Sequence, residues 1–254
     1  MQLMALSSVA ITIVVGCIVG VTLLARAVRT REVPEFAIGL GLFCFCALSR
    51  GLSIASAGLG DSISHGAQLL LLTGSTIGSG LGLFGLLLFT WRVFRPRSGP
   101  AAAAFTAALA AIVVTRIGIA SDFLAVPANQ LPSFADSPTW VGVSVLLWTI
   151  AWLWASGESL RYYAMLRRRV KLGLADPVVM NRFLLWGVGT GVGGFVSASL
   201  IVTTAAGMDV HNHPLPQLLL SISGTAGPIT WYLSFMPPDA YLDFVRRRAR
   251  REEA

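Results

Sequence analysis

The sequence predicts an all-α, polytopic membrane protein: a bundle of seven transmembrane helices with the N-terminus outside the cell and the C-terminus in the cytoplasm. The composition, the spacing of the apolar segments and the placement of the basic residues lead to this class. Hydrophobic residues make up 55% of the 254 residues and charged residues only 12%, whereas an average soluble domain has about 25% charged residues. We therefore expect residues 1–254 to form a single transmembrane domain.

Seven apolar segments are each long enough to cross the hydrocarbon core of a bilayer, which takes about 20 helical residues. They lie at about residues 5–25, 34–57, 67–91, 101–120, 139–163, 183–207 and 216–236. In the third segment Gly74, Gly78 and Gly82 recur at every fourth position, a spacing typical of closely packed membrane helices. In the seventh, Pro228 is expected to free a backbone carbonyl one turn earlier.

The basic residues fix the predicted orientation. They follow the first, third and fifth segments and crowd the tail at 237–254, whereas the other connectors hold acidic residues and no Lys or Arg. Cytoplasmic loops of membrane proteins are rich in Lys and Arg, so a bacterial inner (plasma) membrane location with these loops inside is predicted. The net charge of +7 then reflects topology and contact with anionic lipids of the bilayer rather than binding of nucleic acid.

Arg50 and Arg116 are the two basic residues that depart from this pattern. Arg50 lies about 24 Å along the second segment at ~1.5 Å per residue, and Arg116 lies at a similar depth in the fourth, so both fall in the outer part of the membrane. They either reach outward to lipid phosphates or face inward as a cationic, ligand-binding patch. Asp61 and Asp122 are the candidate partners in the second case, and an anionic ligand could replace them.

Two tryptophans are further candidate binding residues. Trp148 and Trp152 lie four residues apart on one face of the fifth segment, near mid-membrane, where they either line a pocket for an apolar or cationic ligand or pack in the core.

The histidines all lie on the predicted outer side. His211 and His213 could share a zinc or copper ion with His65, Asp209 and Asp61. The same histidines could sense protonation, or they could be ordinary loop residues.

Two stretches, LGLADPVVMNRFLLWG and SFMPPDAYLDF, resemble those of bacterial seven-helix integral membrane proteins of uncharacterised activity. This resemblance implies the seven-helix fold and no particular reaction. The topology is similar to that of rhodopsins and receptors, but the only lysine, Lys171, falls in a cytoplasmic loop. A retinal Schiff base is therefore not expected.

No catalytic motif accompanies the apolar segments, so an enzyme is not expected and no cofactor is firmly implied. A receptor-like sensor that reads an extracytoplasmic or membrane-embedded ligand and acts through a cytoplasmic signalling partner is the preferred hypothesis. The reason is that the spans lack the acidic coupling residue common in proton-driven carriers. A small-solute or metal transporter with a 3+1+3 helix repeat and a membrane assembly or scaffold subunit are the alternatives, and a homo-oligomer is left open.

Overall fold

The chain folds almost entirely into helices, which confirms the all-α class. The computed structural model describes residues 2–206 and 214–253, and the long regular elements in these ranges are all helices. In chain order the elements are α1 (Gln2–Thr30), α2 (Val33–Phe43), η1 (Cys44–Gly51), α3 (Leu52–Leu59), η2 (Gly60–Ser62), α4 (His65–Phe94), α5 (Gly99–Ala125), η3 (Phe134–Asp136), α6 (Pro138–Val170), α7 (Pro177–Ala205), α8 (Pro214–Phe235) and α9 (Asp239–Glu253).

Six helical segments are long and apolar enough to cross a membrane, as a multi-pass membrane protein requires. They are Ser7–Thr30, Val33–Leu59, His65–Phe94, Gly99–Ala125, Pro138–Val170 and Pro177–Ala205. Helix α8, the predicted seventh span, has 22 residues, which gives about 33 Å at ~1.5 Å per residue. It is not among the six, because serines, threonines and prolines dilute its apolar content.

Local capping explains where several helices begin. The Ser64 and Ser98 side chains accept hydrogen bonds from backbone N–H groups in the first turns of α4 and α5. The Asp176 carboxylate accepts from Val178 N at 2.8 Å, and Pro177 occupies the first turn of α7. Such residues satisfy donors that the first turn of a helix leaves unpaired. Because of this cap, α7 begins at residue 177, ahead of the apolar segment at about 183–207.

The chain divides into two compact units. Unit 1 comprises Met1–Val15 and Trp152–Ala254, and unit 2 comprises Gly16–Ala151. Both boundaries fall inside helices, so α1 and α6 each contribute residues to both units.

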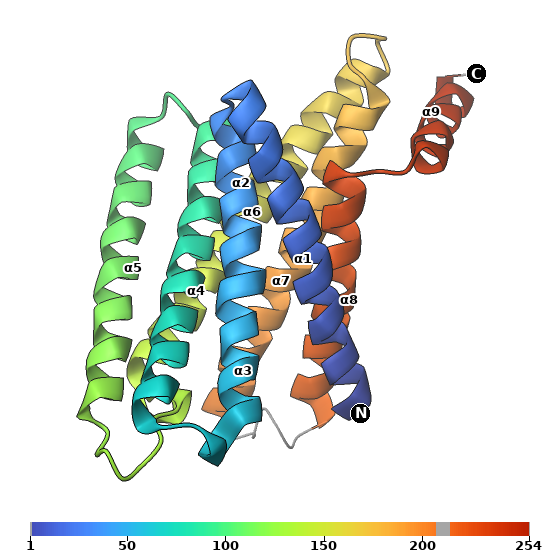
Figure 1. Cartoon of the computed structure of the whole chain (residues 1–254). Coiled ribbons are helices and arrows are strands. Elements are labelled where there is room, and N and C mark those ends of the chain that lie inside the picture. Colours follow the sequence, from blue (N-terminus) through green and yellow to red (C-terminus); the bar gives the residue numbers. More distant parts are fainter. Residues whose placement is uncertain (1, 207–213, 254) are drawn as a thin grey trace. The chain divides into compact units, whose positions relative to one another are not determined.

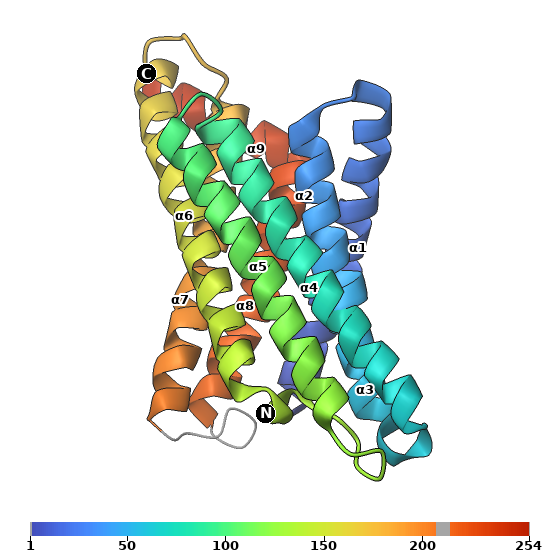
Figure 2. The ribbon, with the colours of Figure 1, turned by 90° about the vertical axis from the view of Figure 1, so that its left-hand side faces the viewer.

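Helix α4 lies at the centre of unit 2, between α2 and α5 (Figures 1 and 2). Its glycines make the contact with α2 and η1. A Cβ atom at Gly78 would lie 2.8 Å from Ser49 N, and one at Gly82 would lie 2.9 Å from the Phe45 Cβ. Side chains at these positions would push the helices apart, so the expected packing role of the α4 glycines is confirmed.

Within unit 1, α8 packs against α7 and against the first part of α1. Pro228, inside α8, has no N–H group to donate to the carbonyl of Gly224 one turn earlier. The Thr12 hydroxyl of α1 lies 2.9 Å from that carbonyl oxygen and also 2.9 Å from the Ser8 carbonyl oxygen in its own helix, so its single proton can be donated to either of them. A Cβ atom at Gly224 would lie 3.0 Å from the Ser8 Oγ. The absence of a side chain at Gly224 thus lets α1 come close enough for this hydrogen bond.

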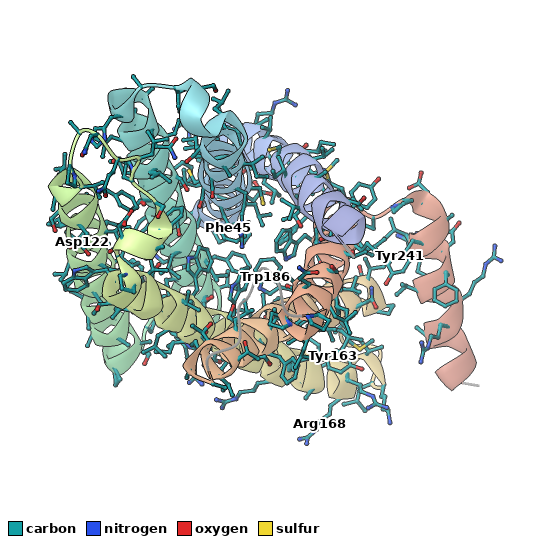
Figure 3. All side chains as sticks on the ribbon, turned by 90° about the horizontal axis from the view of Figure 1, so that it is seen from below. Phe45, Asp122, Tyr163, Arg168, Trp186 and Tyr241 are labelled. Carbon is teal, nitrogen blue, oxygen red and sulfur yellow. The ribbon has the colours of Figure 1, made fainter. Side chains whose placement is uncertain are left out.

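The C-terminal helix α9 also belongs to unit 1. Figure 3 looks along the helices and shows α9 from the side, whereas α7 and α8 are seen nearly end-on. Val245 of α9 is buried, and the Asn181 side chain of α7 donates a 2.8 Å hydrogen bond to the Tyr241 hydroxyl. These contacts hold α9 across the start of α7.

Candidate functional site

The second predicted span contains a π-helix, η1, between α2 and α3. In a π-helix each residue is hydrogen-bonded to the residue five positions on, and such turns are found frequently at functional sites. Phe45 and Arg50 are five residues apart in η1. On a regular α-helix they would point about 140° apart, but the wider π turn brings them onto one face.

Arg50 lies against this aromatic ring. Its guanidinium carbon is 5.2 Å from the centre of the Phe45 ring, within the distance of about 6 Å at which a cation is attracted to an aromatic face. The Arg50 residue as a whole is exposed, and the Phe45 ring covers one side of its guanidinium.

Phe45 in turn contacts the predicted candidate Trp148. Their ring centres are 4.6 Å apart, with planes tilted by 49°. The Trp148 indole N–H donates to the Ser79 hydroxyl of α4 at 3.1 Å, and Trp148 is only 8% exposed. Trp148 is therefore fixed on α6 by contacts with both η1 and α4.

Arg116 of α5 is fixed by its own contacts with α4 and α6. One guanidinium nitrogen donates a hydrogen bond to the Ser144 hydroxyl of α6. The aliphatic stem passes over Gly80 of α4, where a Cβ atom would lie 3.2 Å from the Arg116 Cγ. The Arg116 Nε atom is buried and has no hydrogen-bond partner, so donor capacity remains on this guanidinium.

These contacts form one connected group in unit 2. Ser144 and Trp148 lie four residues apart on α6 and thus share a face. We call Arg50, Phe45, Trp148, Ser144 and Arg116 the arginine–aromatic chain. It joins three of the residues predicted from the sequence, with an arginine at each end.

The carboxylates expected beside these arginines have other positions. The Asp122 side chain accepts a 2.6 Å hydrogen bond from the Ser137 hydroxyl just before α6, and Figure 3 places Asp122 well away from Phe45. Asp61 lies in η2, and its side chain is outside the described part of the structure. Among the side chains that are described, no carboxylate forms an ion pair with Arg50 or Arg116.

Trp152 belongs to unit 1, unlike Trp148. It is 8% exposed and packs parallel to Trp231 of α8, with ring centres 6.3 Å apart and planes 11° apart. Each of the two predicted tryptophans is therefore buried among partners of its own unit.

The metal-binding hypothesis remains a prediction. The His65 Nδ1 atom lies 2.7 Å from the Gln130 carbonyl oxygen. His211, His213 and Asp209 fall outside the described residues. Within the described ranges, no three His, Cys, Asp or Glu side chains are close enough to hold a metal ion.

Two members of the arginine–aromatic chain, Phe45 and Ser144, were not predicted from the sequence. Phe45 is one of several phenylalanines in an apolar run, and only the π-helix sets it under Arg50. Ser144 carried a usable signal, because it lies one turn before Trp148 on the same face.

Comparison of the chain with models of protein families, with curated proteins and with solved structures finds no match. The geometry of unit 2 must therefore carry the functional argument. It offers two guanidinium groups with unused donors, one beside an aromatic surface, and such groups bind carboxylates and phosphates.

Proposed function

We propose that the chain is a seven-span plasma-membrane protein, with its N-terminus outside, that acts as a receptor-like sensor for an anionic ligand. The ligand is bound from the outer side by Arg50 and Arg116. The observation that carries this proposal is the pair of arginines at the ends of the arginine–aromatic chain, without a paired carboxylate among the described side chains.

A charged side chain is costly to place inside a membrane. Placing an arginine at the centre of a membrane helix costs about 2.5–3.5 kcal/mol on insertion scales. Phe45 and Ser144 offset part of this cost, through a cation–π contact and one hydrogen bond. A phosphate or carboxylate would supply the missing negative charge and accept from the remaining donors.

The positions of the charges along the helices support the proposed topology. In unit 2, basic residues lie at the end of α1 and around the α4–α5 turn, whereas Asp61, His65 and Asp122 lie toward the opposite helix ends. In unit 1, basic residues occupy the α6–α7 turn and α9. Figure 1 shows the start of α1 and helix α9 at opposite ends of α8. An odd number of crossings, with α8 as the seventh, agrees with both patterns.

A receptor-like role is preferred because Glu35 and Asp122 lie toward helix ends, and the third acidic residue of the described spans, Glu158, lies in the half of α6 that leads to the proposed cytoplasmic loop. Glu35 is in the first turn of α2, and Asp122 is near the end of α5, bound to Ser137. A proton-coupled carrier would need a carboxylate that can bind and release a proton within the membrane.

The proposal is tested by the thermal stability of purified protein in lipid nanodiscs. The probes are inorganic phosphate, a phosphate monoester such as glycerol 3-phosphate, and acetate. Anions that bind the folded state raise its melting temperature by mass action. We expect at least one probe to raise the melting temperature of the wild type, and Arg50→Gln and Arg116→Gln each to reduce that rise.

Arg92→Gln is the matched control. Arg92 also lies over an aromatic ring, with its guanidinium carbon 4.9 Å from the centre of the Trp91 ring, but it sits at the proposed cytoplasmic end of α4. This variant should respond to the probe like the wild type. Equal rises in all four proteins would contradict the proposal. Uptake of the bound probe into proteoliposomes would favour the transporter alternative over the sensor.

A further inference from the structure

Thr76 of α4 differs from the other buried threonines in the described part of the chain. Those threonines each donate to a backbone carbonyl of their own helix, as threonines in membrane helices commonly do; they are Thr90, Thr115, Thr149, Thr190 and Thr203. Thr76 is 2% exposed, and its hydroxyl has no hydrogen-bond partner among the described residues. A buried hydroxyl without a partner is costly, so the surroundings of Thr76 are a candidate binding site.

Thr76 faces α5, the helix that carries Arg116. Leu72, one turn before Thr76, packs against Ile119 of α5. The stem of Arg116 passes over Gly80, one turn after Thr76. Residues four apart lie on one face of a helix, so Thr76 lies between these two contacts with α5.

Ser144 of α6 lies at the same level. Helices α4 and α6 start at the same end of unit 2 (Figure 2), and Trp148 of α6 is hydrogen-bonded to Ser79 of α4. Ser144, one turn before Trp148, is therefore level with the α4 residues about one turn before Ser79, which include Thr76. Because a terminal nitrogen of Arg116 donates to the Ser144 hydroxyl, the guanidinium reaches this level from α5.

Arg116, Thr76 and Ser144 together offer one N–H and two O–H groups to an acceptor. The Arg116 Nε atom is buried without a partner, and the Ser144 hydroxyl, which accepts from Arg116, keeps its own proton to donate. A water molecule would accept such bonds but would leave the guanidinium charge unneutralised, and a buried charge is costly unless it is paired. Since no carboxylate among the described side chains is paired with Arg116, the donors favour an anion.

The packing next to the donors limits the size of that anion. On the side that leads to the start of α4, Leu72, Ile119 and Phe123 form a core cluster, and each is at most 3% exposed. Trp140 of α6 packs against this cluster, and a Cβ atom at Gly118 of α5 would overlap its ring. Such close contact of α4, α5 and α6 fits a monatomic anion better than a phosphate with four oxygens.

We infer that Arg116, Thr76 and Ser144 form a buried site for a halide ion, which in a cell is chloride. The inference rests on the proposed function in taking Arg116 as an anion-binding group, and it names the class of anion that fits at this end of the arginine–aromatic chain. Arg116 supplies the positive charge, and the two hydroxyls orient toward the ion.

Thermal unfolding of the full-length protein in nanodiscs tests this site. The reference salt is sodium MES, whose bulky sulfonate does not fit among the three side chains, and chloride replaces it at constant ionic strength. Chloride should raise the melting temperature of the wild type in a saturable way, because it binds the folded state. Radioactive chloride should bind to the wild type and not to Arg116→Gln.

Thr76→Val separates ion binding from a structural role of the hydroxyl. Replacing an unpartnered buried hydroxyl by a methyl group of the same shape should leave the melting temperature in MES unchanged or raise it. The chloride concentration for half-maximal stabilisation should rise about tenfold or more, because a hydrogen bond to a charged group is lost. Ser144→Ala should shift it in the same direction.

Thr90→Val is the matched control on the same helix. Thr90 is also buried, but its hydroxyl donates to the Leu86 carbonyl, so this variant should keep the chloride response of the wild type. A wild type that does not respond to chloride would overturn the inference. A response that Thr76→Val leaves unchanged would do the same and would indicate that the hydroxyl binds water.

Phosphate and acetate, added in MES without chloride, keep this test separate from that of the proposed function. A chloride response that depends on Thr76, without a response to either oxyanion, would remove the sensor proposal for those anions and leave the halide site. A phosphate response that Arg116→Gln reduces, without a chloride response, would remove the halide site and leave the sensor proposal.

Discussion

Arg50 stacks on Phe45, five residues earlier in the same π-helix, with the guanidinium carbon 5.2 Å from the ring centre. This contact should be measurable as an energetic coupling. Replacing the charge by Arg50→Gln and the ring by Phe45→Leu, singly and together, should give a coupling of about 0.5–2 kcal/mol in the free energy of unfolding.

The control for this cycle pairs Phe45→Leu with Arg92→Gln. Arg92 lies over Trp91 and not over Phe45, so the two effects should add within about 0.5 kcal/mol. Additive effects of Arg50→Gln and Phe45→Leu would mean that the stacked geometry contributes nothing to stability.

The hydrogen bond between Thr12 and Gly224 joins α1 to α8 in unit 1. Thr12→Val keeps the shape of the side chain but leaves the Gly224 carbonyl without the donor that replaces the missing N–H of Pro228. We expect a loss of about 0.6–1.7 kcal/mol in the free energy of unfolding, measured by unfolding in mixed micelles, and recovery in Thr12→Ser. Thr225→Val serves as the comparison, because the Thr225 hydroxyl donates only within its own helix, to Ser221. A Thr12→Val protein as stable as Thr225→Val would argue against a stabilising hydrogen bond between Thr12 and Gly224.

Close packing of α4 on α2 predicts a sharp difference between two glycines of unit 2. A Cβ atom at Gly85 would lie 2.7 Å from the Gly41 backbone nitrogen, whereas one at Gly142 meets nothing within 4 Å. Gly85→Ala should destabilise the protein by about 1–3 kcal/mol, as overpacking does. Gly142→Ala should be neutral or stabilising by up to about 1 kcal/mol, since alanine favours the helix. Similar melting temperatures for the two variants would show that α2 and α4 are not this close.

The broad fold was accessible from the sequence because membrane helices are encoded by length and hydrophobicity. Six of the seven predicted segments correspond to helices that are apolar and long enough to cross a membrane. The remaining one, α8, shows where the signal is weak: its polar residues make hydrogen bonds, as Thr230 does to Gly227 within the helix. A hydropathy scale counts these side chains as polar and takes no account of the hydrogen bonds they make within the helix.

The candidate site was predictable only in part. Arg50 and Arg116 stood out because a charge is rare in an apolar segment. Their partners did not, because an aromatic ring and a serine are common there. Regular α-helical spacing would not place Phe45 and Arg50 on one face, because the π turn of η1 changes which residues share a face. Asp61 and Asp122 were the candidate acidic partners of the two arginines. Asp122 accepts a hydrogen bond from Ser137 just before α6, a tertiary contact that sequence spacing does not reveal.

The most direct test of the account is the reactivity of Arg50→Cys toward membrane-impermeant thiol reagents added outside intact cells. Wild type, with its three native cysteines within the spans, gives the background. Val114→Cys, at an apolar exposed position of α5, gives the expectation for a lipid-facing thiol.

The proposed outward-facing cationic site predicts that Arg50→Cys reacts from the outside and that Val114→Cys does not. It also predicts that an anionic sulfonate reagent reacts faster than its trimethylammonium counterpart, relative to their rates with a simple thiol, and that adding Arg116→Gln lowers this preference. An Arg50→Cys thiol that reacts only from the cytoplasmic side, or that shows no preference for the anionic reagent, would contradict the central claim.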